Sequence, residues 1–223
     1  MDTKRVVILG VTMFSAEVCE ILRRAGTEVA GFTVDTEYLK EDKFCNLPVY
    51  PFESIGQYVD VKSVEFVLTI GYSGMNDHRE SKYLRCKEMG YNVFTYVSDK
   101  AIVYTEKIGE GSLILPGSYV GPFCEIGKCT IIRPGTVLAH HDMIGDFNWL
   151  ADGCTLGGGV RIDNHCFLGL GTTVRNEINL ADYTFTGAQT YVGHDTEKLK
   201  AYIGVPAREI KSKTSYDVIT KVL

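Results

Sequence analysis

The sequence predicts a small α/β domain, then a parallel β-helix of six-residue repeats, and a short tail. Two observations predict this order: strands alternate with helical patterns in the first hundred residues, and an aliphatic residue recurs at every sixth position from Ile102 to Val192. Neither an α-helix nor a single strand, with periods of about 3.6 and about 2 residues, needs a six-residue repeat. The fold class is therefore α/β followed by a repeat architecture.

The first hundred residues show strands and helices in alternation. Strands are expected over residues 4–9, 29–34, 64–70 and 91–96, and helices over residues 18–25 and about 77–89. Glycine ends the first strand at Gly10 and the first helix at Gly26. This alternation is typical of a small parallel α/β domain, which we expect to span residues 1–99, with the boundary at 98–100.

The repeat then runs through the second domain, residues 100–223. Only Thr186 interrupts the aliphatic column of 16 positions, and small or short residues dominate four positions after each column residue. Three hexads would form one triangular coil, with successive coils about 4.8 Å apart. The column comprises Ile102, Ile108, Ile114, Val120, Ile126, Ile132, Leu138, Ile144, Leu150, Leu156, Ile162, Leu168, Val174, Leu180, Thr186 and Val192.

Composition excludes several classes of protein. A net charge of −5 argues against a broad nucleic-acid or anionic-membrane surface, and no apolar run is long enough for a transmembrane helix. The N-terminus reads as a strand rather than a signal peptide, and seven cysteines without CxxC spacing favour reduced thiols, so we expect a cytoplasmic protein. Cys124, Cys154 and Cys166 fall in the small-residue column and are expected to fill the core.

Two adjacent histidines provide the candidate chemistry. His140 and His141 occupy the corner after Leu138, and the positions one coil further along fall within the three consecutive glycines 157–159, which are expected beside them. An imidazole with a pKa of about 6.5 suits a general base, and a bare backbone N–H could polarise a carbonyl oxygen. A base of this kind is what an amine or hydroxyl needs to attack a thioester. Asp142 or Asp146 could orient the ring.

The remaining histidines are expected to play no part in this chemistry. His165 belongs to a different corner and His78 to the charged helix, so both are interpreted as ordinary solvated side chains. His165 lies 25 residues after His140 and 29 before His194, neither of which is a whole number of 18-residue coils, so the three do not align along one corner; His194 shares the corner of His140 but lies three coils away. A zinc hydratase site needs three converging histidines. We therefore expect no metal ligands.

The chain resembles the bacterial sugar O- and N-acyltransferases of the hexapeptide class, including the sialic-acid O-acetyltransferase and bacillosamine N-acetyltransferase types. The resemblance rests on the alternating first domain, the hexads, the run Ile144-Gly145-Asp146-Phe147 after His140, and the closing Gly204-Val205-Pro206-Ala207. It implies a Rossmann-like first domain that binds the sugar, a left-handed β-helix, acetyl-CoA as co-substrate, and a homotrimer with acetyl-CoA between adjacent β-helices. It also implies His140 as the catalytic base.

The resemblance further implies contacts with acetyl-CoA, whereas the candidate contacts for the acceptor come from the residues themselves. Gly158 would present its N–H to the thioester, with Gly157, Leu170, Gly187 and Ala188 as further acetyl-CoA contacts. Candidate nucleotide or sugar contacts are Gly10, Asp35, Asn76 and Arg79, the last two beside Gly71 and Tyr72.

The sequence departs from the family pattern at several positions. The acid common beside the catalytic histidine is replaced by Ala139 and His141, a second histidine by Trp149, and an asparagine before the turn by Arg133. The glycine-rich turn with a histidine after the first strand reads Gly10-Val11-Thr12-Met13-Phe14-Ser15, so it carries over neither as a nucleotide-sugar site nor as a dinucleotide fingerprint.

The leading hypothesis is an acetyl-CoA-dependent acyltransferase of surface-polysaccharide or glycan biosynthesis. Its acceptor would be the amino group of a nucleotide-linked amino-deoxysugar. Two rivals remain: a zinc hydratase of the carbonic-anhydrase type, and a non-catalytic trimeric scaffold. The sequence decides neither the acceptor nor N- versus O-acylation.

Overall fold

The computed structural model describes residues 5–220 and divides them into two compact units. The first unit holds residues 5–71 and 81–94, and the second holds residues 72–80 and 95–220. The sequence places a single boundary at residues 98–100. The structure instead starts the second unit at Thr95 and assigns to it the segment 72–80, because side chains of that segment bond to the β-helix.

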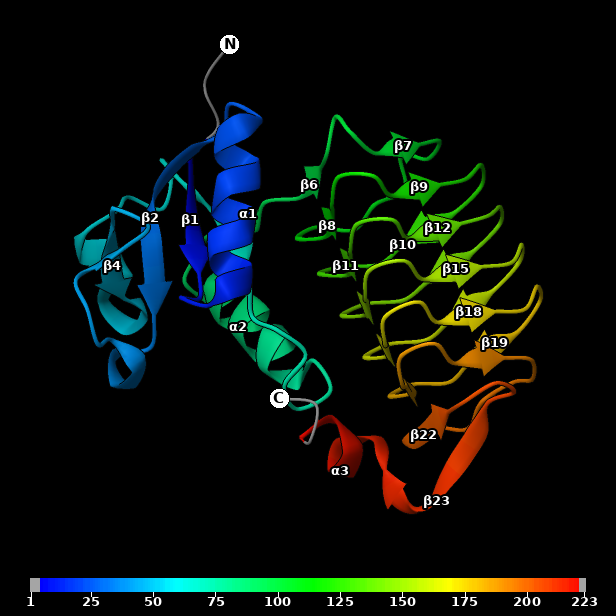
Figure 1. The fold of residues 1–223 in the computed structure, drawn as a ribbon. Coiled ribbons are helices and arrows are strands. Elements are labelled where there is room, and N and C mark those ends of the chain that lie inside the picture. Colours follow the sequence, from blue (N-terminus) through cyan, green and yellow to red (C-terminus); the bar gives the residue numbers. More distant parts are fainter. Residues whose placement is uncertain (1–4, 221–223) are drawn as a thin grey trace. The chain divides into compact units, whose positions relative to one another are not determined.

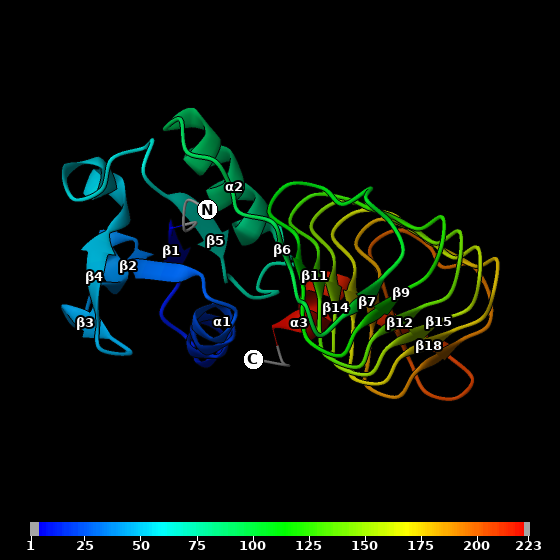
Figure 2. The ribbon, with the colours of Figure 1, turned by 90° about the horizontal axis from the view of Figure 1, so that it is seen from above.

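The first unit is built around a five-stranded sheet with the order β3-β4-β2-β1-β5. Its strands pair in parallel except β3, which is antiparallel to β4, and helices α1 and α2 lie on opposite faces of the sheet (Figure 2). The elements are β1 (Arg5–Leu9), α1 (Met13–Arg24), β2 (Glu28–Val34), η1 (Thr36–Tyr38), β3 (Lys43–Phe44), β4 (Leu47–Pro51), η2 (Phe52–Gln57), β5 (Glu65–Leu68) and α2 (Asp77–Glu88).

Two strands in this half differ from the prediction. The strand expected at residues 91–96 is reduced to an isolated parallel bridge between Phe66 and Val93, and the chain continues as β6 (Tyr96–Val97) in a sheet of the second unit. The strand β4 was not predicted, because proline is unusual inside a strand and β4 contains Pro48 and Pro51. It pairs in parallel with β2 and so covers the edge of β2 that faces away from β1.

The second unit is a three-faced parallel β-helix whose coils stack as the repeat predicts (Figure 1). Two-residue strands pair with the strands one coil further on, as Ile132 does with Leu150 and Leu150 with Leu168. The strands are β7 (Ile102–Val103), β8 (Leu113–Ile114), β9 (Tyr119–Val120), β10 (Glu125–Ile126), β11 (Ile131–Ile132), β12 (Val137–Leu138), β13 (Met143–Ile144), β14 (Trp149–Leu150), β15 (Thr155–Leu156), β16 (Arg161–Ile162), β17 (Phe167–Leu168), β18 (Thr173–Val174), β19 (Asn179–Leu180), β20 (Phe185–Thr186) and β21 (Tyr191–Val192).

The aliphatic column forms the interior of these coils. Every column position from Ile114 to Val192 is buried, including Thr186, whose hydroxyl lies 2.9 Å from that of Thr172. Cys124, Cys154 and Cys166 are fully buried, which confirms that they fill the core. Burial raises the pKa of the Cys154 thiol to about 12, so it stays protonated and unreactive at neutral pH.

The tail forms two strands before the expected short helix. After the last coil, β22 (Lys200–Ile203) joins the β-helix sheet in parallel with β20, and β23 (Arg208–Thr214) returns antiparallel to β22. A short helix, α3 (Ser215–Ile219), follows. Among residues 5–220, no helix has the length and apolar character to cross a membrane.

Candidate functional site

The two histidines lie at an exposed corner directly after β12. His140 and His141 are both exposed. The chain turns sharply there, with His141 in the left-handed region at φ 58°, and the His141 N–H donates to the Pro122 carbonyl one coil below at 3.0 Å. The His141 ring packs against the exposed ring of Phe123, with centroids 4.7 Å apart. The corner therefore presents two imidazoles to solvent on a backbone fixed by the coil beneath.

The two imidazoles contact each other through their Nδ1 atoms, which are 3.1 Å apart. In a neutral pair only one of these nitrogens can carry the proton between them. When His140 donates from Nδ1, its Nε2 has a free lone pair and can act as a base. His141 thus provides a hydrogen-bond partner for Nδ1 of His140.

Gly158 lies directly against the His140 ring. A Cβ built on Gly158 would lie 2.3 Å from Cε1 and 2.6 Å from Nε2 of His140, so any side chain there would displace the imidazole. The strands that precede the two residues pair with Leu138 opposite Leu156, which is the one-coil register predicted from the sequence. The structure therefore brings His140 and Gly158 together, as that register predicts.

The backbone N–H of Gly158 differs from those of its neighbours. Gly157 N donates to the Val174 carbonyl at 2.9 Å and Gly159 N to the His140 carbonyl at 2.8 Å. In the part of the chain that the structure describes, Gly158 N has no acceptor.

At another corner of the β-helix, the backbone N–H at the same hexad position does have an acceptor. There, Lys128 N donates to Asp146 Oδ1 at 2.7 Å, Asp146 N to Asn164 Oδ1 at 2.8 Å, and Asn164 N to Asp182 Oδ1 at 3.0 Å. Each of these N–H groups is thus bonded by a side chain from the next coil. At the His140 corner the N–H of Gly158 stays open to a ligand, as an oxyanion donor must.

The structure corrects the expected position of Asp142. This residue falls in the small-residue column and is fully buried, and its hydrogen bonds go to the backbone rather than to the His140 ring. Its oxygens accept hydrogen bonds from Val160 N at 2.9 Å and Ala139 N at 3.0 Å. Burial raises its pKa to about 6, and the two N–H groups only partly offset that effect. Asp142 supports the backbone of the corner. Asp146, the other candidate, caps Lys128 N.

The remaining predicted acetyl-CoA contacts are divided between two corners. Gly157 lies beside Gly158, and a Cβ there would meet Asn176 N at 2.5 Å. Leu170, 54% exposed, and Ala188, also exposed, occupy successive coils of a different corner of the same β-helix. Gly187 precedes Ala188, and a Cβ on it would meet the Ile203 side chain at 2.8 Å.

Two of the predicted substrate contacts lie at the carboxyl ends of strands in the first unit. Gly10 follows β1 with φ 128° and donates to the Thr33 carbonyl at 2.9 Å, while Asp35 follows β2 and forms an ion pair with Lys82. Ligands of open parallel sheets bind at this edge.

A cavity of about 250 Å³ lies in the same unit. Its lining includes Val11 and Val34, which adjoin Gly10 and Asp35 in the chain, together with Tyr38 and Phe44. Sequence reasoning did not find this cavity, because β3 and β4, which carry part of its lining, were not predicted.

The other two predicted substrate contacts are wrong. Arg79 is fully buried, and its guanidinium donates to the carbonyls of Cys129 at 2.9 Å, Phe147 at 2.8 Å and Asn148 at 3.1 Å. Asn76 is fully buried as well and donates to the Cys166 carbonyl at 3.2 Å. Neither side chain is available to a phosphate or sugar. They bind the segment 72–80 to the β-helix, which explains why that segment belongs to the second unit.

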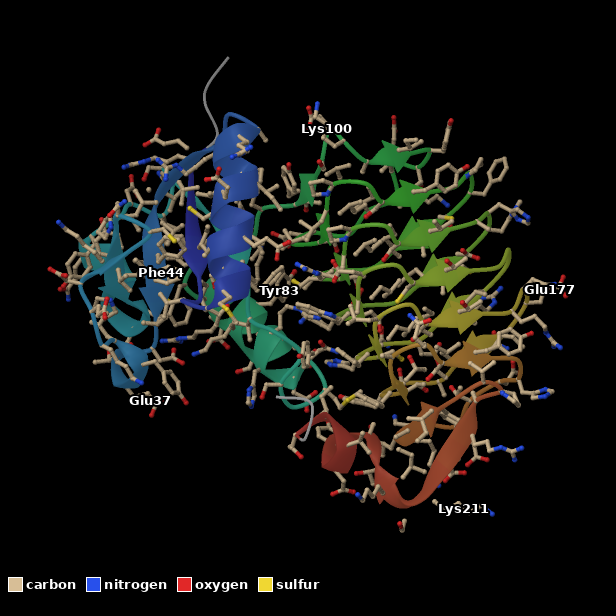
Figure 3. All side chains as sticks on the ribbon, viewed as in Figure 1. Glu37, Phe44, Tyr83, Lys100, Glu177 and Lys211 are labelled. Carbon is tan, nitrogen blue, oxygen red and sulfur yellow. The ribbon has the colours of Figure 1, made fainter. Side chains whose placement is uncertain are left out.

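His165 also differs from the expectation of an ordinary solvated histidine. It is 6% exposed and lies near the carboxylates of Asp77 and Glu80. Figure 3 shows the side chains of the described residues on the ribbon. Within residues 5–220, these three residues form the one group that could hold a metal ion, and it contains a single histidine. The three-histidine arrangement of the zinc hydratases is therefore not formed within the described chain.

Comparison with known proteins agrees with the repeat. The profile of the family described as bacterial transferase hexapeptide (six repeats) matches residues 107–140. Residues 107–140 are thus similar to the hexapeptide repeat described for bacterial transferases. Comparison with curated proteins finds no match.

Solved structures share the fold over nearly the whole chain. The acetyltransferase domain of PglB from Neisseria gonorrhoeae FA1090 superposes with a TM-score of 0.82 at 17% identity, covering 93% of this chain and 100% of that one. A variant of perosamine N-acetyltransferase from Caulobacter crescentus, in complex with CoA and GDP-perosamine, gives 0.83 at 24% identity, covering 94% and 97%. WeeI from Acinetobacter baumannii AYE gives 0.75 at 20% identity, covering 93% and 100%. The mostly parallel sheets and few helices are consistent with the left-handed β-helix of an acetyltransferase.

Proposed function

We propose that this protein is an acetyl-CoA-dependent acyltransferase that acetylates the amino group of a nucleotide-linked amino-deoxysugar. The observation that carries the proposal is the exposed His140 ring, which lies against Gly158 and its unpaired N–H. A base and an oxyanion donor so close together are the two groups that acyl transfer from a thioester requires. The similar folds of PglB and of the perosamine N-acetyltransferase that holds CoA and GDP-perosamine support the assignment.

The proposed reaction uses the two groups in sequence. The amine nitrogen of the sugar attacks the thioester carbonyl carbon, and His140 Nε2 removes a proton from that nitrogen. The negative charge that develops on the carbonyl oxygen is stabilised by the N–H of Gly158. When the C–S bond breaks, His140 returns the proton to the departing thiolate, which leaves CoA and the acetylated sugar.

In this mechanism His141 positions the base. Its Nδ1, 3.1 Å from that of His140, accepts a hydrogen bond from the Nδ1–H group of His140. The proton of His140 therefore stays on Nδ1, and the Nε2 lone pair is free for the substrate. Replacing His141 with Asn should lower kcat more than it changes KM, because the acetyl-CoA contacts remain. An unchanged kcat would contradict the positioning role.

We further propose that the acceptor binds the Rossmann-like first unit. The cavity that Tyr38 and Phe44 help to line suits a nucleotide base, since an aromatic ring and a base can stack. Gly10 and Asp35 at the ends of β1 and β2 would face the rest of the nucleotide.

Acetyl-CoA is proposed to bind between two copies of the chain in a homotrimer. Its predicted contacts Leu170 and Ala188 lie at a different corner from His140, which favours a site assembled from one corner of each of two neighbouring β-helices. Equilibrium ultracentrifugation tests this directly, and a monomer that is fully active would contradict it.

The decisive experiment measures CoA thiol release from acetyl-CoA with a panel of nucleotide-linked amino sugars and their hydroxyl analogues. His140→Ala should lower kcat at least about 100-fold, because it removes the general base. His78→Ala, at an exposed position on α2, is the matched control and should keep its activity. Near-normal turnover by His140→Ala would remove the base from the mechanism, and no binding of acetyl-CoA by calorimetry would favour the scaffold alternative.

A further inference from the structure

A second cluster of side chains lies within the β-helix unit, away from the His140 corner. His165 Nδ1 is 3.4 Å from Asp77 Oδ1, and His165 Nε2 is 3.3 Å from Glu80 Oε2. One potential ligand atom from each residue lies within 4.8 Å of the other two. Asp77 and Glu80 both belong to the first turn of α2, so both carboxylates project from one face of that helix.

Aromatic stacking holds the His165 ring in place, and its buried Nδ1 has no hydrogen-bond partner within the described residues. It stacks between the rings of Phe147 and Tyr183, with centroid distances of 5.3 and 4.7 Å. These residues follow one another on successive coils along one corner, so the β-helix itself sets the stack. Nδ1 of His165 is buried and has no hydrogen-bond partner in the described chain, although two carboxylates lie near the ring. An unpaired nitrogen at this depth is costly unless a ligand satisfies it.

The Asp77 carboxylate and the backbone of the segment are held in place. Arg79, between Asp77 and Glu80 in sequence, is buried and bonded to three carbonyls of the β-helix, and Asn76 donates to the carbonyl of Cys166, the neighbour of His165. The hydroxyl of Tyr216 in α3 donates to Asp77 Oδ2 at 2.6 Å, which leaves Oδ1 for the imidazole. Asp77 and His165 are therefore positioned before any ligand binds, and Glu80 lies on the same fixed helical turn.

One spacing in this cluster matches a coordination sphere. Zinc binds imidazole nitrogen and carboxylate oxygen at about 2.0–2.2 Å, so two ligands of a tetrahedral ion lie about 3.4 Å apart. His165 Nδ1 and Asp77 Oδ1 are 3.4 Å apart, whereas Glu80 Oε2 lies 3.3 Å from the other ring nitrogen, Nε2, so an ion bound to Nδ1 would require the half-exposed Glu80 carboxylate to turn toward it. An imidazole with two carboxylates favours a first-row transition cation over Mg²⁺ or Ca²⁺, which prefer oxygen alone. The Tyr216 hydroxyl would orient Asp77 from outside the sphere, as such partners commonly do.

We propose that Asp77, Glu80 and His165 bind one divalent transition-metal cation of the Zn²⁺ type. The bound ion would join the first turn of α2 to the corner of the β-helix, and water would complete its coordination. The site is independent of the proposed acyl transfer, since none of its residues belongs to the His140 corner. Its role would be to stabilise the attachment of the segment 72–80.

The test uses the full-length, tag-free chain after removal of metal by a chelator. Titration with ZnCl₂ by calorimetry should show one ion per chain, and Co²⁺ should give the visible absorption of a low-symmetry site. Saturating Zn²⁺ should raise the thermal midpoint by about 5 °C or more, because a ligand that binds only the folded chain stabilises it. Glu80→Gln and His165→Asn should each weaken Zn²⁺ binding at least about 10-fold and abolish the thermal shift.

The controls separate this site from other histidines. The double variant His140→Asn/His141→Asn and the single variant His78→Asn should bind one Zn²⁺ with unchanged affinity. Glu80→Gln changes a half-exposed residue, so it tests the site even if His165→Asn fails to fold. Absence of Zn²⁺ and Co²⁺ binding to the native chain overturns the proposal and leaves an imidazole between two carboxylates. Binding that survives in Glu80→Gln, or that disappears with His140 and His141, also overturns it.

Discussion

Replacing Gly158 with alanine tests the proposed site at its tightest contact. The backbone at Gly158 is not in the left-handed region, so alanine suits its conformation, but the new Cβ would lie 2.3 Å from His140 Cε1. The ring would have to retreat by about 1.1 Å to restore the 3.4 Å at which ordinary carbon contacts begin. His140 is exposed, so it can move with little loss of stability. A displacement of about 1 Å at a reacting group can cost about 100-fold in rate, or about 2.7 kcal/mol.

The assay is CoA release at saturating acetyl-CoA, with thermal unfolding followed in parallel. Gly158→Ala keeps the backbone N–H, so its effect should pass through His140, and adding Gly158→Ala to His140→Ala should lower activity little further. Gly56→Ala, whose Cβ would meet only Tyr91 Oη at 3.7 Å, is the matched control. Activity of Gly158→Ala within threefold of the native protein would show that the position of the His140 ring against Gly158 does not limit the rate. An equal loss in both backgrounds would show that the effect does not act through the imidazole.

Two further predictions concern stability. Because the folded-state pKa of Asp142, about 6, lies above its ordinary 3.8, the folded chain binds this proton more tightly. The stability from Asp142 is thus present below pH 3.8 and is lost as pH rises to 6. Urea titrations of the native protein and of Asp142→Asn measure this effect as the difference between their unfolding free energies. That difference should fall by up to about 2 kcal/mol from pH 4 to pH 7, and a constant difference would contradict the prediction. Arg79→Met should lower the unfolding free energy by about 3 kcal/mol, because buried carbonyls lose a charged donor, whereas Arg85→Met on the exposed side of α2 should change it by less than about 0.5 kcal/mol. Equal effects of the two substitutions would refute the role assigned to Arg79.

The repeat allowed much of the β-helix to be predicted, because a constant coil length converts sequence separation into position. Stacked strands repeat their register at every coil, so Gly158 could be placed beside His140 by counting. The same counting set His165 apart from the His140 corner. It could not show that His165 is buried, since two of the residues around it, Asp77 and Glu80, come from outside the repeat.

The misplaced residues share one cause. Asn76 and Arg79 lie in a segment whose polar composition is typical of an exposed patch, and only the folded chain shows that they bond to the β-helix. Asp142 is a similar case, because a carboxylate in a column of small residues gives no sign in sequence of the two backbone N–H groups that it bonds. A polar residue at a column position could nevertheless have been recognised as buried, and this is the signal that the sequence offered.

The β-helix, its coil length, its core and the alignment of a histidine with a glycine could all be predicted from the sequence, because they follow from local periodicity. Only the folded chain shows which polar side chains face solvent and which hold the segment 72–80 to the β-helix. It also shows that the Gly158 N–H lacks an acceptor within the described residues and that His165 meets two carboxylates. These features depend on contacts between residues far apart in the chain, and no period in the sequence records such contacts.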